Sequence, residues 1–310
     1  MGNPLISVCC LAYNHAPYIR QALDGILMQK TQYSFEVIIH DDASTDGTTE
    51  IIREYEEKYP DIIKPIYQKE NQYSKIGQAL FPQCVWPKSQ GKYIALLECD
   101  DFWTDPQKLE MQVRYMETHA DCSGTCHAAD WLTDEKIIKN DQRFCTESDI
   151  SPEQMILGGG DFVSTASLCF RKQCVLSWPH FCEIANVLDY PLQILLTLRG
   201  NLHYFPQTMS CYRFGRPGSW TDQMQADKEK HYKALRAAVR WLTELDKETN
   251  GKYATEIYYK IGKEKCVLYK RNQISFQELS DVLSHMEMGK LKLSMIKKCY
   301  ERYIRYAWFR

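Results

Sequence analysis

The chain has 310 residues, of which 44% are hydrophobic and 25% are charged, and its formal net charge is −2. These values argue against a minimal domain, a disordered chain and a globally basic nucleic-acid-binding protein. No run of about 18 apolar residues predicts a membrane-spanning helix, and no signal peptide precedes the first apolar run. We therefore expect a cytoplasmic protein with one large domain and an appendage, or with two domains.

The 13 cysteines are an odd number, and several lie inside apolar runs. Cys122 and Cys126 lie near His119 and His127, but no pair of CxxC motifs has the spacing of a zinc site. We interpret the cysteines mainly as buried thiols of a reducing compartment, with a structural zinc site as the less favoured alternative.

The first hundred residues alternate between short apolar runs and helical patterns. The apolar runs are continuous, which is typical of strands covered on both faces. The expected strands span residues 6–11, 35–39, 62–67 and 93–97. Apolar residues at helical spacing over 18–27 and 48–59 separate the first three runs. This order predicts a parallel sheet with right-handed crossovers.

The second half of the chain is less regular. We expect strands over residues 162–171, 203–205 and 209–214, and a helix over 192–198. From about residue 222 the composition changes to charged, helix-forming residues. We therefore predict a catalytic domain over residues 1–221 and a helical extension over 222–310.

Acidic residues follow two of the expected strands. Asp42 lies in the loop after residues 35–39, and Asp100 and Asp101 follow residues 93–97. Ligands of open α/β sheets bind at the carboxyl ends of the strands. Adjacent carboxylates repel each other, and a hard divalent ion relieves that repulsion, binds pyrophosphate and acts as a Lewis acid. A solvated loop is the alternative for either cluster alone.

Three segments resemble the family 2 glycosyltransferases of bacterial polysaccharide biosynthesis, which have the GT-A fold. These segments read ISVCCLAYN at residues 6–14, EVIIHDDASTDGT at 36–48 and ECDDFW at 98–103, with Lys108 and Leu109 continuing the last pattern. The resemblance is clear over about residues 5–130 and weaker over 160–220. It implies an α/β fold with a mixed, mainly parallel sheet flanked by helices, and a C-terminal helical extension.

The resemblance also implies roles for individual residues at the donor site. Ala12, Tyr13 and Asn14 would line the nucleotide pocket, and Asp42 would accept a hydrogen bond from the base, expected to be uracil or a related ring.

Asp100 would contact the ribose, and Asp101 would coordinate Mn²⁺ or Mg²⁺ bound to the diphosphate. Glu98 stands where the family often has Asp, so its role is left open. Many relatives carry a metal-binding His where this chain has Gly215 and Arg216.

Two arginines are candidates for the diphosphate. Arg213 and Arg216 carry guanidinium groups, whose geometry matches phosphate oxygens. A surface salt bridge is the alternative for either arginine.

The catalytic base is expected in the second half of the chain. The resemblance places Asp189, just before the helix over 192–198, as the residue that deprotonates the acceptor hydroxyl, which would invert the anomeric configuration. A simple helix cap is the alternative, because a helix N-terminus favours a carboxylate. Asp161 and Glu183 are further candidates for the base.

The acceptor side is less specific. Ser164, Thr165 and Ser167 either face the acceptor or alternate along a strand. Trp178 and Trp103 either stack on a sugar ring or pack in the core.

Residues 290–310 contain seven Lys and Arg and one Glu, interleaved with apolar and aromatic residues. One interpretation is a basic helix on an anionic membrane surface, which would suit an acceptor held on a lipid carrier. The alternative is a helix packed on the protein with its charges in water. Nothing else in the sequence supports nucleic-acid binding.

Together these features predict an inverting transfer from a nucleotide-diphosphate sugar, expected to be a UDP-sugar, to a glycan or lipid-linked acceptor hydroxyl. The expected products are capsule, O-antigen or exopolysaccharide. A non-catalytic nucleotide- or glycan-binding protein is the alternative. A nucleotidyltransferase fits less well, because residues 13–17 replace its Gly-rich basic loop.

Overall fold

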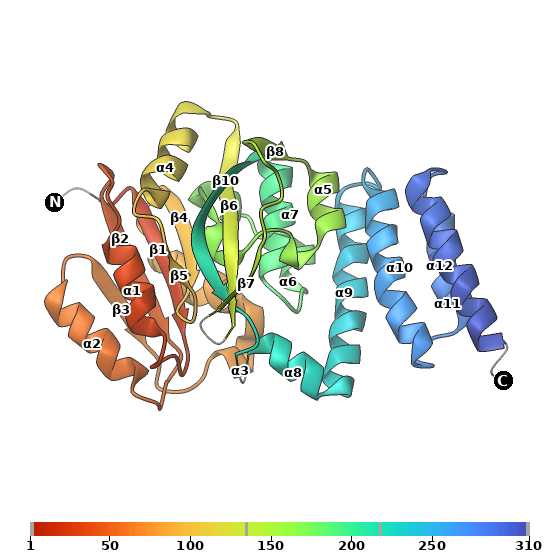
Figure 1. The fold of residues 1–310 in the computed structure, drawn as a ribbon, viewed down its shortest axis with the longest axis horizontal. Helices are drawn as coiled ribbons and strands as arrows, with labels where there is room; N and C mark the ends of the chain where they lie inside the picture. Colours follow the sequence, from red (N-terminus) through yellow and green to blue (C-terminus); the bar gives the residue numbers. More distant parts are fainter. Residues whose placement is uncertain (1–2, 134–135, 217–218, 308–310) are drawn as a thin grey trace. The chain divides into compact units, whose positions relative to one another are not determined.

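The computed structural model describes residues 3–133, 136–216 and 219–307 (Figure 1). The chain divides into two compact units. The first comprises residues 1–151, 160–177 and 192–216, and the second comprises residues 152–159, 178–191 and 217–310. The domain boundary expected after residue 221 stays a prediction.

The first unit is built on a ten-stranded sheet whose order is β3-β2-β1-β4-β9-β6-β10-β5, with β7 paired to β6 and β8 to β10. The strands are β1 (Ile6–Ala12), β2 (Phe35–Asp41), β3 (Ile63–Tyr67), β4 (Tyr93–Glu98), β5 (Phe102–Trp103), β6 (Cys122–Thr133), β7 (Lys136–Asn140), β8 (Ser148–Ile150), β9 (Cys169–Arg171) and β10 (Asn201–Arg213). The neighbours β3, β2, β1 and β4 are parallel, whereas β9 is antiparallel to both β4 and β6. The predicted mixed sheet is confirmed.

Helices and short turns connect these strands. They are α1 (Ile19–Leu27), α2 (Thr48–Lys58), α3 (Tyr73–Ile76), η1 (Gly77–Ala79), η2 (Phe81–Val85), η3 (Trp86–Lys88), α4 (Lys108–Thr118), η4 (Gly160–Phe162), η5 (Thr165–Ser167) and η6 (Lys172–Val175). Helix α7 (Asp189–Arg199) begins in the second unit and ends in the first.

The core of the sheet explains the continuous apolar runs. Every residue of β1 except Leu11 is buried, and so is every residue of β4 except Glu98. Side chains on both faces of these strands are therefore shielded from water, and their burial stabilises the central sheet. A strand buried on both faces has a continuous apolar sequence, whereas a half-exposed strand alternates apolar and polar residues.

One strand prediction for the second half was wrong, and two others are confirmed as parts of a single longer strand. Residues 162–171 form two short 3₁₀ turns before β9, which takes up the last three residues. The strands expected over 203–205 and 209–214 are one strand, β10, whose pairing with β6 shifts register between Phe205 and Thr208. The shift explains why the apolar pattern breaks there, because an irregular ladder turns side chains to the other face.

The second unit is helical. It contains α5 (Pro152–Gly158), α6 (His180–Glu183), α8 (Trp220–Ala226), α9 (Lys228–Glu248), α10 (Ala254–Lys270), α11 (Phe276–Ser280), η7 (Asp281–His285) and α12 (Lys290–Ala307). Helices α9, α10 and α12 lie side by side (Figure 1). Helix α12 packs closely on α10 at Gly262, where an added Cβ would lie 2.6 Å from the Met295 side chain.

Helix α12 presents a mixed surface. Met295 and Cys299 are buried, whereas Leu293 and Tyr300 are 58% and 63% exposed. One face of α12 is therefore packed on the protein, as the alternative interpretation expected. A second face exposes apolar side chains to water. Among the described residues, no helix has the length and hydropathy needed to cross a bilayer.

Candidate functional site

The parallel register brings the sequence motifs to one edge of the sheet. Ala12 lies opposite Asp41, and Leu11 lies opposite Glu98, so β1, β2 and β4 end at the same level. The amide of Cys99 donates to the Leu11 carbonyl at 2.9 Å, which carries the β4 end alongside the β1 loop. The loops after these three strands therefore adjoin one another, as expected for a ligand site of an open α/β sheet.

Asn14 connects the first two of these loops. It has a φ of +55°, a left-handed conformation that Asn tolerates better than most residues. Its side-chain oxygen accepts from the Thr45 amide at 2.9 Å, and its own amide donates to the Ser44 hydroxyl at 3.0 Å. The ring of Tyr13 next to it is 46% exposed. This loop thus offers an exposed aromatic face on a hydrogen-bonded frame.

Asp42 is 4% exposed and holds the start of α3 in place. Its two carboxylate oxygens accept from the amides of Gln72 at 2.6 Å and Tyr73 at 2.9 Å. His40 Nε2 lies 3.4 Å from the same carboxylate. Each carboxylate oxygen has two lone pairs, so these contacts leave acceptor capacity for a ligand.

Asp100 forms an ion pair with Arg216. Both Nε and Nη2 of Arg216 lie 2.8 Å from Oδ2 of Asp100, and the two side chains are 17% and 15% exposed. Arg216 follows the end of β10, so this contact links the acidic turn after β4 to a distant segment of the sequence. The motif comparison alone does not predict that pairing.

Asp101 is 2% exposed, and its Oδ1 accepts from the Arg213 amide at 2.8 Å. The Arg213 guanidinium donates to the Asp100 carbonyl and to Gln21, and lies 4.7 Å from the Phe102 ring centroid. Arg213 therefore fixes the acidic turn through its backbone and its side chain.

The environment of Asp101 disfavours its negative charge. Burial raises the pKa of the Asp101 carboxyl well above its usual range, and the neighbouring Asp100 and Glu98 carboxylates raise it further. A cation beside Asp101 would relieve this cost.

The carboxylate oxygens at this turn fit a hard divalent ion that takes most of its ligands from substrate phosphates and waters. Among the described residues, no three His, Cys, Asp or Glu side chains converge into a metal cage. Mg²⁺ typically uses one or two carboxylates together with substrate phosphates and waters. One buried carboxylate, with two guanidinium groups bonded to the same acidic turn, is compatible with that pattern.

His15 belongs to the site and was not predicted. It is 7% exposed, its Nε2 lies 3.9 Å from Asp100 Oδ2, and its Nδ1 is buried without a hydrogen-bond partner among the described residues. Burial lowers the pKa of His15, although Asp100 opposes this shift. His15 directly follows Tyr13 and Asn14 in the loop after β1, and that position could have identified it as a candidate. For the loops after β1, β2 and β4, the sequence prediction considered only the carboxylates and the Tyr13-Asn14 motif.

The predicted base lies in the second unit. Asp189 is the first residue of α7, is partly buried, and accepts from the Tyr190 amide at 2.8 Å through Oδ1. Of the other candidates, Glu183 is exposed and bonded to His180 at 3.1 Å, and Asp161 is exposed at a 3₁₀ turn.

The predicted acceptor residues do not share one environment. Ser164 precedes turn η5, and Thr165 and Ser167 lie within it, so the alternation expected along a strand is absent there. Trp178 is half-buried in the second unit. Trp103 is 2% exposed and donates to the Ala166 carbonyl at 2.9 Å, which excludes it from stacking on a sugar.

The zinc alternative finds no support in the described residues. All 13 cysteines are free thiols, and Cys122 and Cys126 are buried. Burial raises the pKa of both thiols, which disfavours the thiolate that zinc requires.

Comparison with known sequences identifies the family. The profile described as Glycosyl transferase family 2 matches residues 7–157. Rv1520 of Mycobacterium tuberculosis, an uncharacterized protein, is 35% identical over 221 residues, 69% of this chain and 60% of the relative. TuaG of Bacillus subtilis, named for teichuronic acid biosynthesis, is 38% identical over 114 residues, 37% of this chain and 42% of the relative.

WfaP of Escherichia coli, named a UDP-Glc:alpha-D-GlcNAc-diphosphoundecaprenol beta-1,3-glucosyltransferase, is 36% identical over 114 residues, 37% of this chain and 42% of the relative. The chain thus spans about 60% of the length of Rv1520 and less than half of TuaG and WfaP.

Solved structures show the same fold at low sequence identity. S. aureus TarS 1-349 in complex with UDP-GlcNAc has a TM-score of 0.62 at 14% identity, covering 96% of this chain and 89% of TarS. The mannosyltransferase PcManGT from Pyrobaculum calidifontis, in complex with GDP-Man and Mn²⁺, has a TM-score of 0.54 at 13% identity, covering 100% and 89%. The predicted GT-A-like α/β fold with a C-terminal helical region is confirmed.

Proposed function

The chain belongs to glycosyl transferase family 2, and on that premise we propose that it transfers a sugar from a nucleotide-diphosphate sugar to an acceptor hydroxyl. The observation that carries the proposal is the meeting of Asp42, Asp100 and Asp101 with Arg213 and Arg216 at one edge of the sheet. Carboxylates can bind a base, a ribose and a metal ion, and guanidinium groups can bind phosphate oxygens. These are the groups that a nucleoside diphosphate requires.

Each part has a distinct role in donor binding. The exposed Tyr13 ring stacks on the base, and Asp42 accepts a hydrogen bond from it with its remaining lone pairs. Asp100 contacts the ribose, and Arg213 and Arg216 bind diphosphate oxygens. The uracil expected from the family resemblance makes a UDP-sugar the proposed donor.

Enzymes of this family typically use a divalent metal, and we propose that Asp101 holds Mn²⁺ or Mg²⁺ here. The buried Asp101 carboxylate, beside two further acidic residues, fits such an ion. The ion would neutralise the diphosphate leaving group as a Lewis acid. Arg213 keeps Asp101 oriented through its amide, so the carboxylate does not have to be ordered when the donor binds.

Asp189 is the proposed base of an inverting transfer. A helix N-terminus favours a carboxylate, and Asp189 would accept the proton of the acceptor hydroxyl while that oxygen attacks the anomeric carbon. General-base assistance contributes about 10²–10⁴ in rate.

The proposed acceptor is a glycan or lipid-linked saccharide in the synthesis of a surface polysaccharide. Two relatives support this assignment, since TuaG and WfaP are named for such pathways or acceptors. The exposed apolar residues and basic charge of α12 support a peripheral contact with the inner face of the membrane.

Thermal unfolding with UDP, GDP, dTDP and CDP, each with and without Mn²⁺, tests the donor site. A ligand at about 100 times its dissociation constant adds about 2.7 kcal/mol of stability. We expect a shift with one nucleotide that depends on Mn²⁺, followed by release of that nucleotide from its sugar when an acceptor is present. Binding without release would favour a non-catalytic binding protein, and no shift with any nucleotide would contradict the proposed function.

A further inference from the structure

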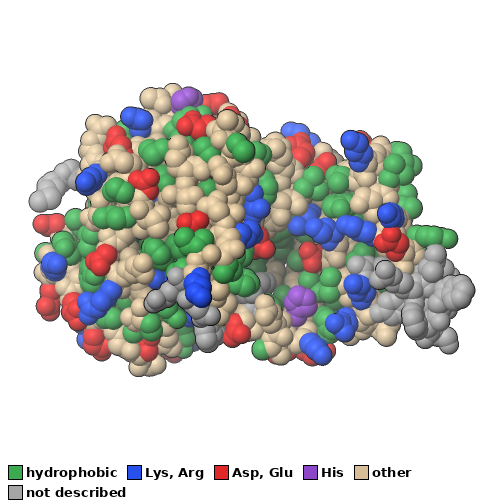
Figure 2. Space-filling view, viewed as in Figure 1, with side chains coloured by type: hydrophobic (Ala, Val, Ile, Leu, Met, Phe, Trp, Pro, Cys, Tyr) green, Lys and Arg blue, Asp and Glu red, His purple; other side chains and the backbone are tan. Residues whose placement is uncertain are grey.

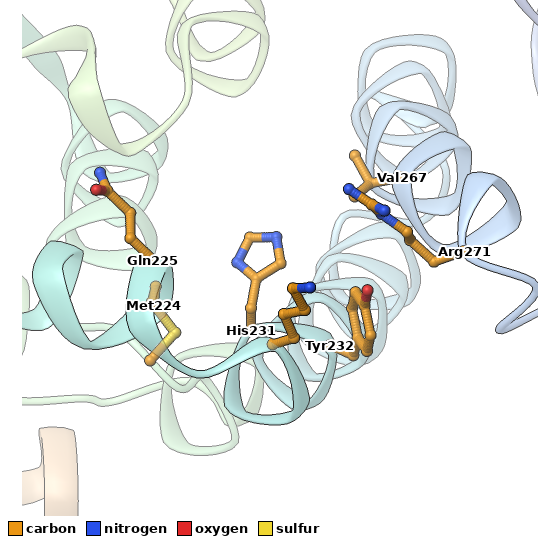
Figure 3. A pocket seen from close by; sticks show the side chains of 7 residues that line it. Met224, Gln225, His231, Tyr232, Val267 and Arg271 are labelled. Atoms are coloured by element: carbon orange, nitrogen blue, oxygen red, sulfur yellow. The ribbon is translucent and has the colours of Figure 1, made fainter.

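A hollow opens on the surface of the second unit, and none of its lining residues has a role in the proposals above. It has a volume of about 480 Å³ and is lined by residues of α8, of α9 and of the C-terminal part of α10. The lining residues are Met224, Gln225, Lys228, His231, Tyr232, Val267 and Arg271. Figure 3 shows His231 pointing into this space from α9 and Arg271 reaching toward it from the end of α10. We call this hollow the basic groove.

The basic groove is cationic and has no acidic lining residue. Within the described part of the chain, the side chains of Lys228, His231 and Arg271 form no hydrogen bond and no ion pair. Nearby Glu264 interacts electrostatically with His231, but burial raises the pKa of Glu264, which weakens it as a counter-ion. Cationic groups around one hollow without partners favour an anionic ligand.

The sequence concentrates positive charge in this part of the chain. Residues 217–310 contain 19 Lys and Arg and 12 Asp and Glu, whereas residues 1–216 contain 19 and 28. The corresponding formal charges are +7 and −9, so the net value of −2 conceals two regions of opposite sign. Figure 2 shows Lys and Arg side chains gathered on one face of the second unit.

The wall of the basic groove is otherwise largely apolar. Met224 and Tyr232 are each 8% exposed and form its buried floor, and Val267 is 36% exposed. A free inorganic anion gains nothing from this surface, whereas an anion attached to a hydrocarbon chain buries part of that chain on it. Exposed apolar side chains of α12 in the same unit suit a ligand presented at a membrane.

We propose that the basic groove binds the diphosphate group of a lipid-linked acceptor. Lys228 and Arg271 pair with the phosphate oxygens, His231 donates a further hydrogen bond, and the first carbons of the lipid lie on Met224 and Tyr232. This inference rests on the proposed function, because it gives that reaction an acceptor-recognition site separate from the donor site.

The test measures binding of farnesyl diphosphate and of inorganic pyrophosphate to the full chain by calorimetry. The donor site is first saturated with Mn²⁺ and whichever nucleoside diphosphate stabilises the protein, so that neither probe reports on it. The test variant is Lys228→Gln with Arg271→Gln. The matched control is Lys233→Gln with Arg240→Gln, two exposed cations of α9 that do not line the basic groove.

We expect farnesyl diphosphate to bind at least about tenfold more tightly than pyrophosphate, because of the apolar floor. We expect the test variant to weaken farnesyl diphosphate binding about tenfold or more, and the control variant to leave it unchanged. Retained nucleotide binding by the test variant would show that it is folded and that its donor site is intact.

Equal binding of both probes, or equal losses in test and control variants, would overturn the proposal. Binding to phosphatidylglycerol vesicles without binding to farnesyl diphosphate would also overturn it and would indicate a general membrane surface. If no nucleotide binds the wild-type protein, the proposed donor site fails. The comparison of farnesyl diphosphate with pyrophosphate is then made without nucleotide and still decides the role of the basic groove.

Discussion

Removal of the ion pair between Arg216 and Asp100 should have opposite effects on metal binding and on nucleotide binding. In Arg216→Gln, Asp100 loses two contacts of 2.8 Å to a guanidinium in a setting where both side chains are less than a fifth exposed. Hydrogen bonds to charged groups contribute about 1.5–3 kcal/mol each in net terms, so a loss of about 2 kcal/mol is a reasonable total for a shared oxygen. For a domain of this size that corresponds to a fall in Tm of roughly 4 °C.

The same substitution leaves Asp100 without its counter-ion. Mn²⁺ alone should therefore stabilise Arg216→Gln more than the wild type, whereas the nucleoside diphosphate should bind the variant more weakly because a phosphate-binding guanidinium is gone. The control is Arg20→Gln, which breaks an ion pair to Glu54 whose side chains are both more than half exposed. Pairs of that kind contribute about 0–1 kcal/mol.

Thermal unfolding of the three proteins, with Mn²⁺ and nucleotide added separately, tests both the expected gain in stabilisation by Mn²⁺ and the expected loss in stabilisation by nucleotide. An Arg216→Gln protein as stable as the Arg20→Gln control would refute the estimate for the ion pair. Equal stabilisation of wild type and Arg216→Gln by Mn²⁺ would refute the idea that the guanidinium and a cation compete for Asp100.

Three further predictions concern the acidic turn, the base and a buried lysine. Asp101→Asn should raise the stability of the ligand-free protein, because it removes a carboxyl whose ionised form burial disfavours, and should abolish stabilisation by Mn²⁺ with nucleotide; thermal unfolding measures both. Asp189→Asn should bind nucleotide as the wild type does and lose at least about 10²-fold in transfer rate, and a transfer assay with full activity would remove Asp189 as the base. Burial lowers the pKa of Lys108 to about 7. Between about pH 7 and its ordinary pKa of 10.5, the unfolded state then holds a proton that the folded state lacks, so this group makes stability rise with pH. Denaturant titrations at pH 7 and 9.5 should show a smaller rise in Lys108→Met, and parallel pH profiles for the two proteins would contradict the assignment.

The sequence predicted the half of the sheet whose strands are buried on both faces. Residues 6–11, 35–39 and 93–97 are continuous apolar runs, and parallel pairing forces their carboxyl ends, with the acidic residues that follow, to one edge. The meeting of Asp42, Asp100 and the Asn14 loop at that edge therefore follows from local pattern and chain order alone.

The other half of the sheet depends on contacts between residues that are far apart in the sequence, which local sequence patterns do not predict. Strand β6 is long and buried, but Ser123, Gly124 and Ala128 lack the β-branched and aromatic side chains that mark a strand. Its place in the sheet comes from pairing with β10, about 80 residues later, through an irregular ladder. The placement of Arg213 and Arg216 beside the acidic turn depends on the same pairing.

The environments of Asp100 and Asp101 explain how adjacent carboxylates can take different roles. Asp100 is partly exposed and already paired with a guanidinium, so a ligand hydroxyl approaches a neutralised group. Asp101 is buried and accepts from a backbone amide, and burial raises its pKa even though the Arg213 guanidinium lies nearby and opposes that shift. A divalent ion therefore gains more from Asp101 than from Asp100.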